Sequence, residues 1–143
     1  MTSTLYEKIR KKSIVLLDQD PWIRGSLSLL FQCEACRFAE FDNVAEGMQA
    51  LRNEQFDVII CDYGMGDEGG IAFLREAGHV QPGAVRILTA GYPLGDIADV
   101  AAREGIDGCL QKPFTLDALE KTLGGLIDDD STGNGNSAHR ASG

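Results

Sequence analysis

Five short apolar segments alternate with five segments of helical hydrophobic spacing between residues 13 and 127. We predict strands over residues 13–17, 37–41, 56–61, 84–89 and 106–110, each centred on apolar residues. Residues 56–61 are apolar throughout their centre, as is typical of a strand that is covered on both faces. The pattern therefore predicts a buried sheet whose strands are separated by helices.

The segments between the strands carry apolar residues at intervals of three and four, which is the spacing of one helix face. Ile23, Leu27 and Leu30 show this spacing after the first strand. Asp20 and Asn43 are candidate N-caps of the first two helices. The later helices are predicted over residues 70–77, over residues 94–104 and from residue 115 onward.

Regular alternation of strands and helices predicts a parallel sheet with helices on both faces. With right-handed crossovers this gives an α/β fold: a flavodoxin-like, doubly wound three-layer sandwich with a five-stranded parallel sheet. We assign residues 13–127 to this domain and residues 1–12 to an N-terminal extension. Residues 128–143 are almost free of apolar side chains, so we expect a disordered acidic and polar tail or linker.

Composition narrows the class of protein. The 143 residues suffice for one domain, and 22 acidic against 13 basic residues give a net charge of −9. An acidic surface repels phosphate backbones, so we expect no nucleic-acid binding by this chain. No apolar run is long enough for a membrane span, and residues 1–12 do not resemble a signal peptide. We therefore expect a cytoplasmic protein without a membrane segment.

Polar residues with related chemistry follow the predicted strands. Asp18, Asp62, Thr89 and Lys112 stand at or just after the ends of four of them. Ligands of such folds bind beyond the carboxyl ends of the strands, so we expect these side chains to meet at one edge. Two carboxylates and a loop carbonyl suit Mg²⁺, and a carboxylate can accept a phosphoryl group as an aspartyl phosphate. A metal ion and a lysine would neutralise the charge of that group.

On these residues the chain resembles the receiver domain of two-component response regulators. The resemblance covers residues 12–127; its matching segments are residues 14–21, 56–62, 87–90 and 110–114, and Gly70 matches a glycine of the family. It implies that Asp62 accepts a phosphoryl group from a sensor histidine kinase or a phosphotransfer protein, in a reaction that requires Mg²⁺. The resemblance further implies that Asp18, Asp62 and the Gly64 backbone carbonyl bind the metal.

The same resemblance implies a phosphate contact for Lys112 and a switching role for the Thr89 hydroxyl. Two positions depart from the family pattern. Gln19 stands where the family has a second acid, so it is an atypical member of the metal site, and we expect weaker Mg²⁺ binding. Cys109 stands where the family often has an aromatic switch residue. We therefore expect phosphorylation to be coupled to the partner-binding face either weakly or through backbone shifts.

The implied function is a phosphorylation-controlled change of partner binding. The domain would catalyse only its own phosphorylation and dephosphorylation, so it would not be an enzyme that turns over a metabolite. The output would be a downstream protein or a fused domain. A homodimer through the face of residues 94–104, 106–110 and the final helix is also implied by the resemblance.

Two alternatives remain open from the sequence. Gln19 and Cys109 are compatible with a pseudo-receiver that binds proteins without being phosphorylated. The segment from Asp18 to Asp20 also matches the D-x-D motif of haloacid-dehalogenase-like phosphatases, in which Asp18 would be the nucleophile. In the receiver interpretation the phosphoryl group is carried by Asp62 instead, so mutation separates the two.

Overall fold

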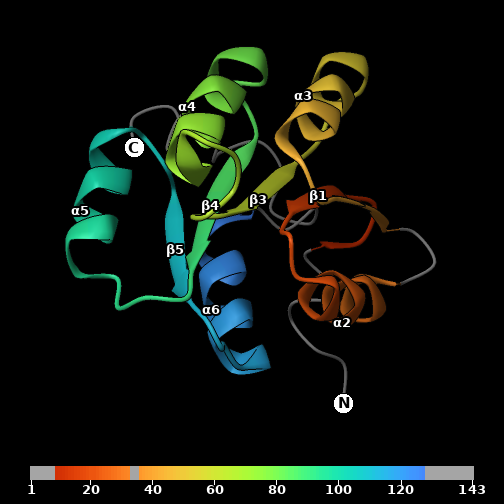
Figure 1. Ribbon diagram of the computed structural model, residues 1–143. Helices are drawn as coiled ribbons and strands as arrows, with labels where there is room; N and C mark the ends of the chain where they lie inside the picture. Colours follow the sequence, from red (N-terminus) through yellow and green to blue (C-terminus); the bar gives the residue numbers. More distant parts are fainter. Residues whose placement is uncertain (1–8, 33–35, 128–143) are drawn as a thin grey trace.

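Five parallel strands form one sheet in the computed structural model of the protein, which describes residues 9–32 and 36–127 (Figure 1). The strands are Ser13–Leu17 (β1), Arg37–Phe41 (β2), Val58–Asp62 (β3), Val85–Ala90 (β4) and Gly108–Gln111 (β5). Their order across the sheet is β2-β1-β3-β4-β5, and all neighbours are parallel. This is the order of flavodoxin-like folds, so the predicted fold class is confirmed.

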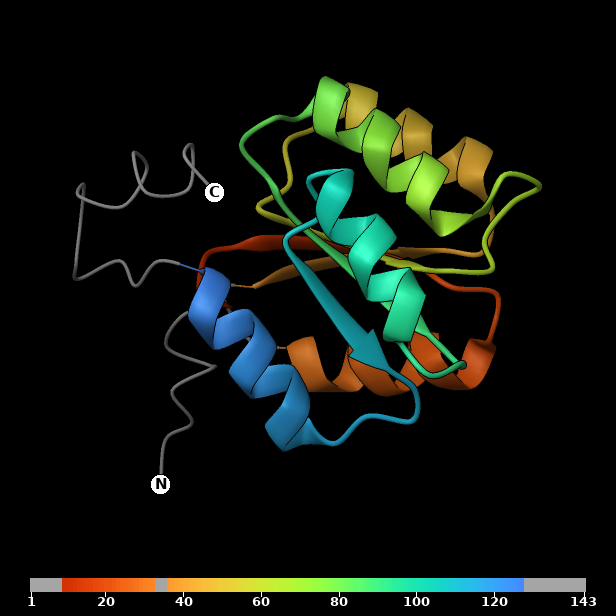
Figure 2. The same ribbon diagram turned by 90° about the vertical axis from the view of Figure 1, so that its left-hand side faces the viewer.

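Five helices cover the two faces of the sheet. They are Pro21–Phe31 (α2), Val44–Asn53 (α3), Gly69–Val80 (α4), Gly95–Arg103 (α5) and Leu116–Leu126 (α6). Figure 2 shows α3, α4 and α5 on one face of the sheet and α2 and α6 on the other, which makes three layers. Over the described part of the chain, no helix combines the length and the apolar character needed to cross a membrane.

Each central strand contributes to two hydrophobic cores, because successive side chains point to opposite faces. In β1, Val15 and Leu17 pack against the α3–α5 layer, whereas Ile14 and Leu16 pack against α2 and α6. Ile9 is fully buried in the second core, so the assigned N-terminal extension contributes to the folded domain. Residues 128–143, which we expected to be disordered, lie outside the described residues.

Three predicted element boundaries were wrong by two or three residues. The strand predicted from Phe56 begins at Val58, because the Phe56 backbone N–H donates to the side chain of Gln81 at 2.8 Å. The strand predicted from Ile106 begins two residues later, because the Ile106 N–H donates to a carbonyl of α5. The third helix continues through Gly78, where the missing side chain leaves room for an arginine guanidinium.

Candidate functional site

The carboxyl ends of the strands bring three of the predicted site residues into contact. The Lys112 ammonium nitrogen lies 2.8 Å from Asp18 Oδ2 and 2.9 Å from Asp62 Oδ1. Asp18 follows β1 and Asp62 ends β3, which are neighbouring strands, whereas Lys112 reaches them from the far side of β4. One ammonium therefore bridges two carboxylates at the point where the strand order of the sheet reverses.

Asp18 is buried, and both its side chain and its backbone carbonyl accept hydrogen bonds. Its residue is only 2% exposed, and its Oδ1 accepts a hydrogen bond from the Asp20 backbone N–H at 2.9 Å. Its backbone carbonyl accepts from Arg24 Nη1 at 2.8 Å, and Arg24 also pairs with Glu40 at 3.0 Å. Sequence reasoning missed Arg24, because no spacing along the chain predicts where so long a side chain will reach.

Asp62 and Thr89 are neighbours across the β3–β4 ladder. The Asp62 Oδ2 atom accepts a hydrogen bond from the Gly64 backbone N–H at 3.0 Å, so the loop begins by folding back on this carboxylate. The Thr89 carbonyl accepts from the Tyr63 N–H at 2.6 Å. The two strand ends are therefore joined immediately beside the carboxylate.

Thr89 carries a buried hydroxyl whose hydrogen-bonding capacity is unused. The residue is 1% exposed, and within the described residues its Oγ1 is the one buried side-chain nitrogen or oxygen that lacks a hydrogen-bond partner. Leaving such a group unsatisfied costs about 1–3 kcal/mol. A hydroxyl of this kind beside Asp62 is available to a ligand that brings an acceptor oxygen.

Replacing Thr89 by valine is expected to raise the free energy of unfolding by about 1 kcal/mol, because an apolar group of the same shape removes the unsatisfied hydroxyl. Urea denaturation without ligands measures this change. Thr89→Ala is the control, since it removes the hydroxyl but leaves a cavity and should not stabilise the protein. A Thr89→Val protein less stable than wild type would show that the hydroxyl is satisfied in solution.

The electrostatics of the site keep the lysine charged. Burial by itself would lower the pKa of Lys112, but hydrogen bonds and charge interactions with Asp18 and Asp62 together raise it above its ordinary value. Directly beneath the site, burial and the same two carboxylates raise the pKa of the Cys61 thiol. Cys61 is therefore a protonated core residue rather than a nucleophile.

Other predicted residues lie apart from this cluster. The Gln19 side chain is exposed, and Asp20 is exposed and caps α2 by accepting the Trp22 N–H at 2.9 Å. Cys109 is half-buried opposite Leu88 in the β4–β5 ladder and packs against the core under α3–α5. The Lys112–Pro113 peptide bond is cis.

The donor set fits a hard cation that keeps part of its water shell. Within residues 9–32 and 36–127, no group of three or more His, Cys, Asp and Glu side chains converges, so a closed protein cage is absent there. Asp18 and Asp62 nevertheless offer two carboxylates at one edge, beside the loop whose Gly64 N–H donates to Asp62. Mg²⁺ is commonly bound by one or two carboxylates together with waters and phosphate oxygens.

Comparison with known proteins gives consistent results. The family described as response regulator receiver domain matches residues 14–124. The transcriptional regulatory protein GlrR of Escherichia coli (strain K12) is 32% identical over 116 residues, which are 80% of this chain and 26% of GlrR. The chain thus spans about a quarter of the length of this relative.

Solved structures share the fold. A CheY-like receiver domain from Methanospirillum hungatei JF-1 is 26% identical, with a TM-score of 0.75, over 85% of this chain and 98% of that chain. A response regulator from Burkholderia pseudomallei, solved with a phosphorylated aspartic acid, calcium ion and citrate, has a TM-score of 0.72 at 20% identity, over 92% and 71% of the two chains. Family match, relative and fold agree: this chain belongs to the response regulator receiver domain family.

Proposed function

We propose that this receiver domain accepts a phosphoryl group on Asp62 and thereby changes its affinity for a partner protein. The donor is the phosphohistidine of a sensor histidine kinase or of a phosphotransfer protein, and the reaction requires Mg²⁺. The observation that carries the proposal is the Lys112 ammonium, which bridges Asp18 and Asp62 next to the unpartnered Thr89 hydroxyl. The site thus combines a nucleophile, a fixed positive charge and a free hydrogen-bond donor.

The proposed step is a direct transfer. An Asp62 carboxylate oxygen attacks phosphorus, the bond between phosphorus and the histidine nitrogen breaks, and that nitrogen keeps the electron pair. The Lys112 ammonium faces the phosphoryl oxygens and offsets their negative charge. The Thr89 hydroxyl donates to one phosphoryl oxygen and so gains its missing partner. That gain draws Thr89 toward the product and is the proposed origin of the switch.

Asp18, Asp62 and the Gly64 carbonyl would hold Mg²⁺, which supplies positive charge to the phosphoryl oxygens when bound. The two carboxylates are already adjacent, because Lys112 contacts both of them. Gln19 brings no charge to this edge, and its side chain is exposed. The proposed metal site is therefore less negative than one with a second strand-end acid.

Gln19→Asp is expected to tighten Mg²⁺ binding about tenfold. One added charge at about 4 Å is worth roughly 4 kcal/mol in gross attraction, and repulsion from Asp18 and solvation offset most of it. Magnesium titration followed by the shifts of site amides in NMR measures the affinity. Gln32→Asp, a change of the same charge near the end of α2, is the control. If Gln19→Asp and wild type bind Mg²⁺ with equal affinity, residue 19 does not contribute to the metal site.

The relatives support the wider role. GlrR is named a transcriptional regulatory protein, and the Burkholderia pseudomallei protein was solved with a phosphorylated aspartic acid and a divalent ion. By analogy we propose a fused output domain or a downstream protein as the partner, a cytoplasmic location, and a homodimer through α5, β5 and α6. The exposed Val100 of α5 supports such a contact.

The phosphatase alternative has less support from the geometry. It requires the Asp20 carboxylate to act beside Asp18, whereas Asp20 is exposed and its carboxylate caps the first turn of α2. GlrR is named a regulatory protein, which also favours a domain without metabolite turnover. The pseudo-receiver alternative differs from the proposal in that Asp62 would not be phosphorylated, which intact mass can measure.

Intact mass after incubation with acetyl phosphate and Mg²⁺ tests the proposal. We expect wild type to gain one phosphoryl group and Asp62→Asn to gain none. A modification that persists in Asp62→Asn and disappears in Asp18→Asn would favour the phosphatase alternative. A wild type that stays unmodified at high Mg²⁺ concentration would favour the pseudo-receiver.

A further inference from the structure

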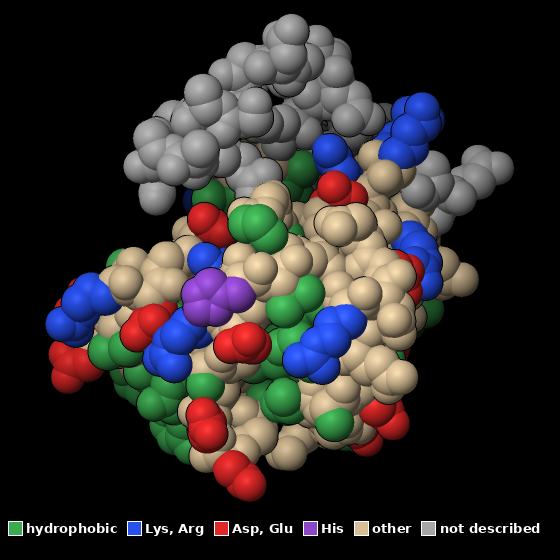
Figure 3. All heavy atoms as spheres, turned by 90° about the horizontal axis from the view of Figure 1, so that it is seen from above, with side chains coloured by type: hydrophobic (Ala, Val, Ile, Leu, Met, Phe, Trp, Pro, Cys, Tyr) green, Lys and Arg blue, Asp and Glu red, His purple; other side chains and the backbone are tan. Residues whose placement is uncertain are grey.

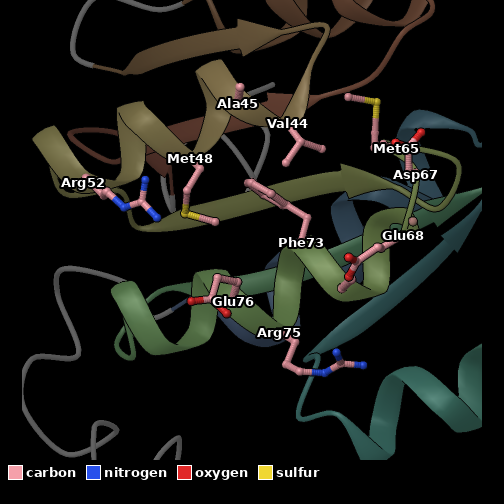
Figure 4. A pocket seen from close by; sticks show the side chains of 13 residues that line it. Val44, Ala45, Met48, Arg52, Met65, Asp67, Glu68, Phe73, Arg75 and Glu76 are labelled. Carbon is pink, nitrogen blue, oxygen red and sulfur yellow. The ribbon is translucent and has the colours of Figure 1, made fainter.

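Arg24 differs from the arginines on the outer surface of α3 and α4. Figure 3 shows Lys and Arg side chains among acidic and hydrophobic ones on the face that these two helices form. Arg52 and Arg75, which line a groove between the helices, are exposed side chains of this kind (Figure 4). The Arg24 side chain is only 19% exposed and lies at the carboxyl edge of the sheet. Arginine side chains are mostly exposed unless they are paired, so the partners of Arg24 indicate what it does.

The partners of Arg24 lie on two neighbouring strands. Its Nη1 donates to the Asp18 backbone carbonyl at 2.8 Å, and its Nε donates to Glu40 Oε1 at 3.0 Å. Asp18 directly follows β1, whereas Glu40 belongs to β2. Because the donors of a guanidinium lie in one rigid plane, the two contacts fix the Asp18 carbonyl relative to β2.

The β1–β2 hydrogen-bond ladder ends at Asp18. The Asp18 backbone N–H still donates to the carbonyl of Phe41, the last residue of β2, at 3.1 Å. In a parallel ladder the Asp18 carbonyl would next accept from residue 43, but Asn43 is the N-cap of α3. Arg24 Nη1 donates to this carbonyl instead. The guanidinium thus replaces a strand hydrogen bond at the residue that carries a proposed metal ligand.

We propose that Arg24 is a positioning residue of the metal site, which holds the Asp18 backbone so that the Asp18 carboxylate stays beside Asp62. Asp18 Oδ2 is 2.8 Å from the Lys112 ammonium, and Oδ1 accepts from the Asp20 N–H at 2.9 Å, so the loop that Arg24 anchors also orients the carboxylate. Mg²⁺ requires nearly octahedral coordination, so a displaced carboxylate binds it less well. The inference rests on the proposed function, because it takes Asp18 as a metal ligand.

Electrostatics alone would give Arg24 the opposite effect. A guanidinium near the site repels Mg²⁺, so its removal would tighten metal binding if charge were its only contribution. Glu40 pairs with the guanidinium and offsets much of that charge, which leaves the hydrogen bond to the Asp18 carbonyl as the larger contribution. The sign of the change in Mg²⁺ affinity therefore separates positioning from charge.

The test compares Arg24→Ala, Arg24→Lys and wild type as full chains. We expect Arg24→Ala to weaken Mg²⁺ binding about tenfold in magnesium titrations followed by NMR, because it removes a residue that orients a metal ligand. It should also speed hydrogen exchange of the Asp20 amide in the metal-free protein. Arg24→Lys keeps the charge and one donor group, so it should recover part of both losses.

Arg37→Ala is the matched control, because Arg37 pairs with Glu54 at the start of β2, away from the carboxyl edge, and its loss removes the same charge. Unchanged or tighter Mg²⁺ binding by Arg24→Ala would overturn the inference, as would an equal loss in Arg37→Ala. A wild type that binds no Mg²⁺ would contradict the proposed metal site itself. In that case the Asp20 amide still decides: faster exchange in Arg24→Ala supports the positioning, and equal exchange overturns it.

Discussion

Lys112→Ala is expected to lower the free energy of unfolding by about 3 kcal/mol at neutral pH. The substitution leaves Asp18 and Asp62 side by side without the ammonium that now contacts both. Removing one partner of a buried ion pair costs about 3–5 kcal/mol, and the Lys112 side chain, 17% exposed, places the effect at the lower end. Phosphotransfer should fall at least about a hundredfold, because a fixed charge facing the phosphoryl oxygens is lost.

Urea denaturation of Lys112→Ala and of Lys121→Ala measures the first effect. Lys121 pairs with Asp117 at 3.5 Å on the surface of α6, so its loss should cost less than about 1 kcal/mol. Adding Asp18→Asn to Lys112→Ala should restore part of the stability, because a single carboxylate then remains. Equal effects of the two lysine substitutions would contradict the account of the bridge.

The pH dependence of this difference has a definite sign. The pKa of Lys112 is raised above its ordinary value of 10.5 in the folded protein, because its contacts with Asp18 and Asp62 outweigh burial. A raised pKa of a basic group stabilises the fold at every pH below the unfolded value, and the stabilisation is lost as pH rises through the folded value. The difference between wild type and Lys112→Ala should therefore persist to about pH 10 and shrink above 10.5.

Gly70→Ala is expected to destabilise the domain by about 2–3 kcal/mol and to slow phosphorylation of Asp62. A Cβ at position 70 would overlap the Asp62 carbonyl oxygen and lie 3.0 Å from the Tyr63 Cα. The first turn of α4 cannot move away freely, because the Gly70 N–H donates to the Tyr63 carbonyl at 2.8 Å. Relief of the overlap must therefore displace the strand end that carries the phosphoacceptor.

Gly25→Ala is the matched control, since a Cβ at that position in α2 would meet nothing within 4 Å. Alanine in a helix interior is preferred to glycine by about 0.5–1 kcal/mol, so this variant should be slightly more stable than wild type. Urea denaturation and the rate of mass gain with acetyl phosphate give the two readouts. A Gly70→Ala protein that matches wild type in both would show that α4 and β3 tolerate the added carbon.

The strand-end residues could be predicted because they depend on chain order and not on exact distances. Apolar runs located the strands, and the parallel arrangement placed Asp18, Asp62 and Lys112 at one edge, where the structure joins them. The contact of Arg24 with the Asp18 carbonyl could not be predicted in this way. It depends on the angle at which α2 leaves the sheet and on a long side chain with several accessible conformations.

Features that depend on the separation of helices were equally inaccessible from the sequence. A groove lined by Met48 of α3 and Phe73 of α4 lies between these two helices, and no spacing along the chain predicts its width. Burial of Ile9 was missed as well: Leu5 and Ile9 stand four residues apart, but one such interval in a short charged segment does not predict burial. Local patterns thus predicted elements and strand ends, whereas packing between elements determined the rest.

The proposed phosphotransfer places the phosphoryl group on Asp62 itself. The direct measurement is borohydride reduction of the protein after incubation with acetyl phosphate and Mg²⁺, followed by peptide mass mapping. An acyl phosphate is reduced to an alcohol, so we expect homoserine at position 62 and unchanged aspartate at positions 18 and 20. Homoserine at position 18, or no reduced residue in a protein that binds Mg²⁺, would contradict it.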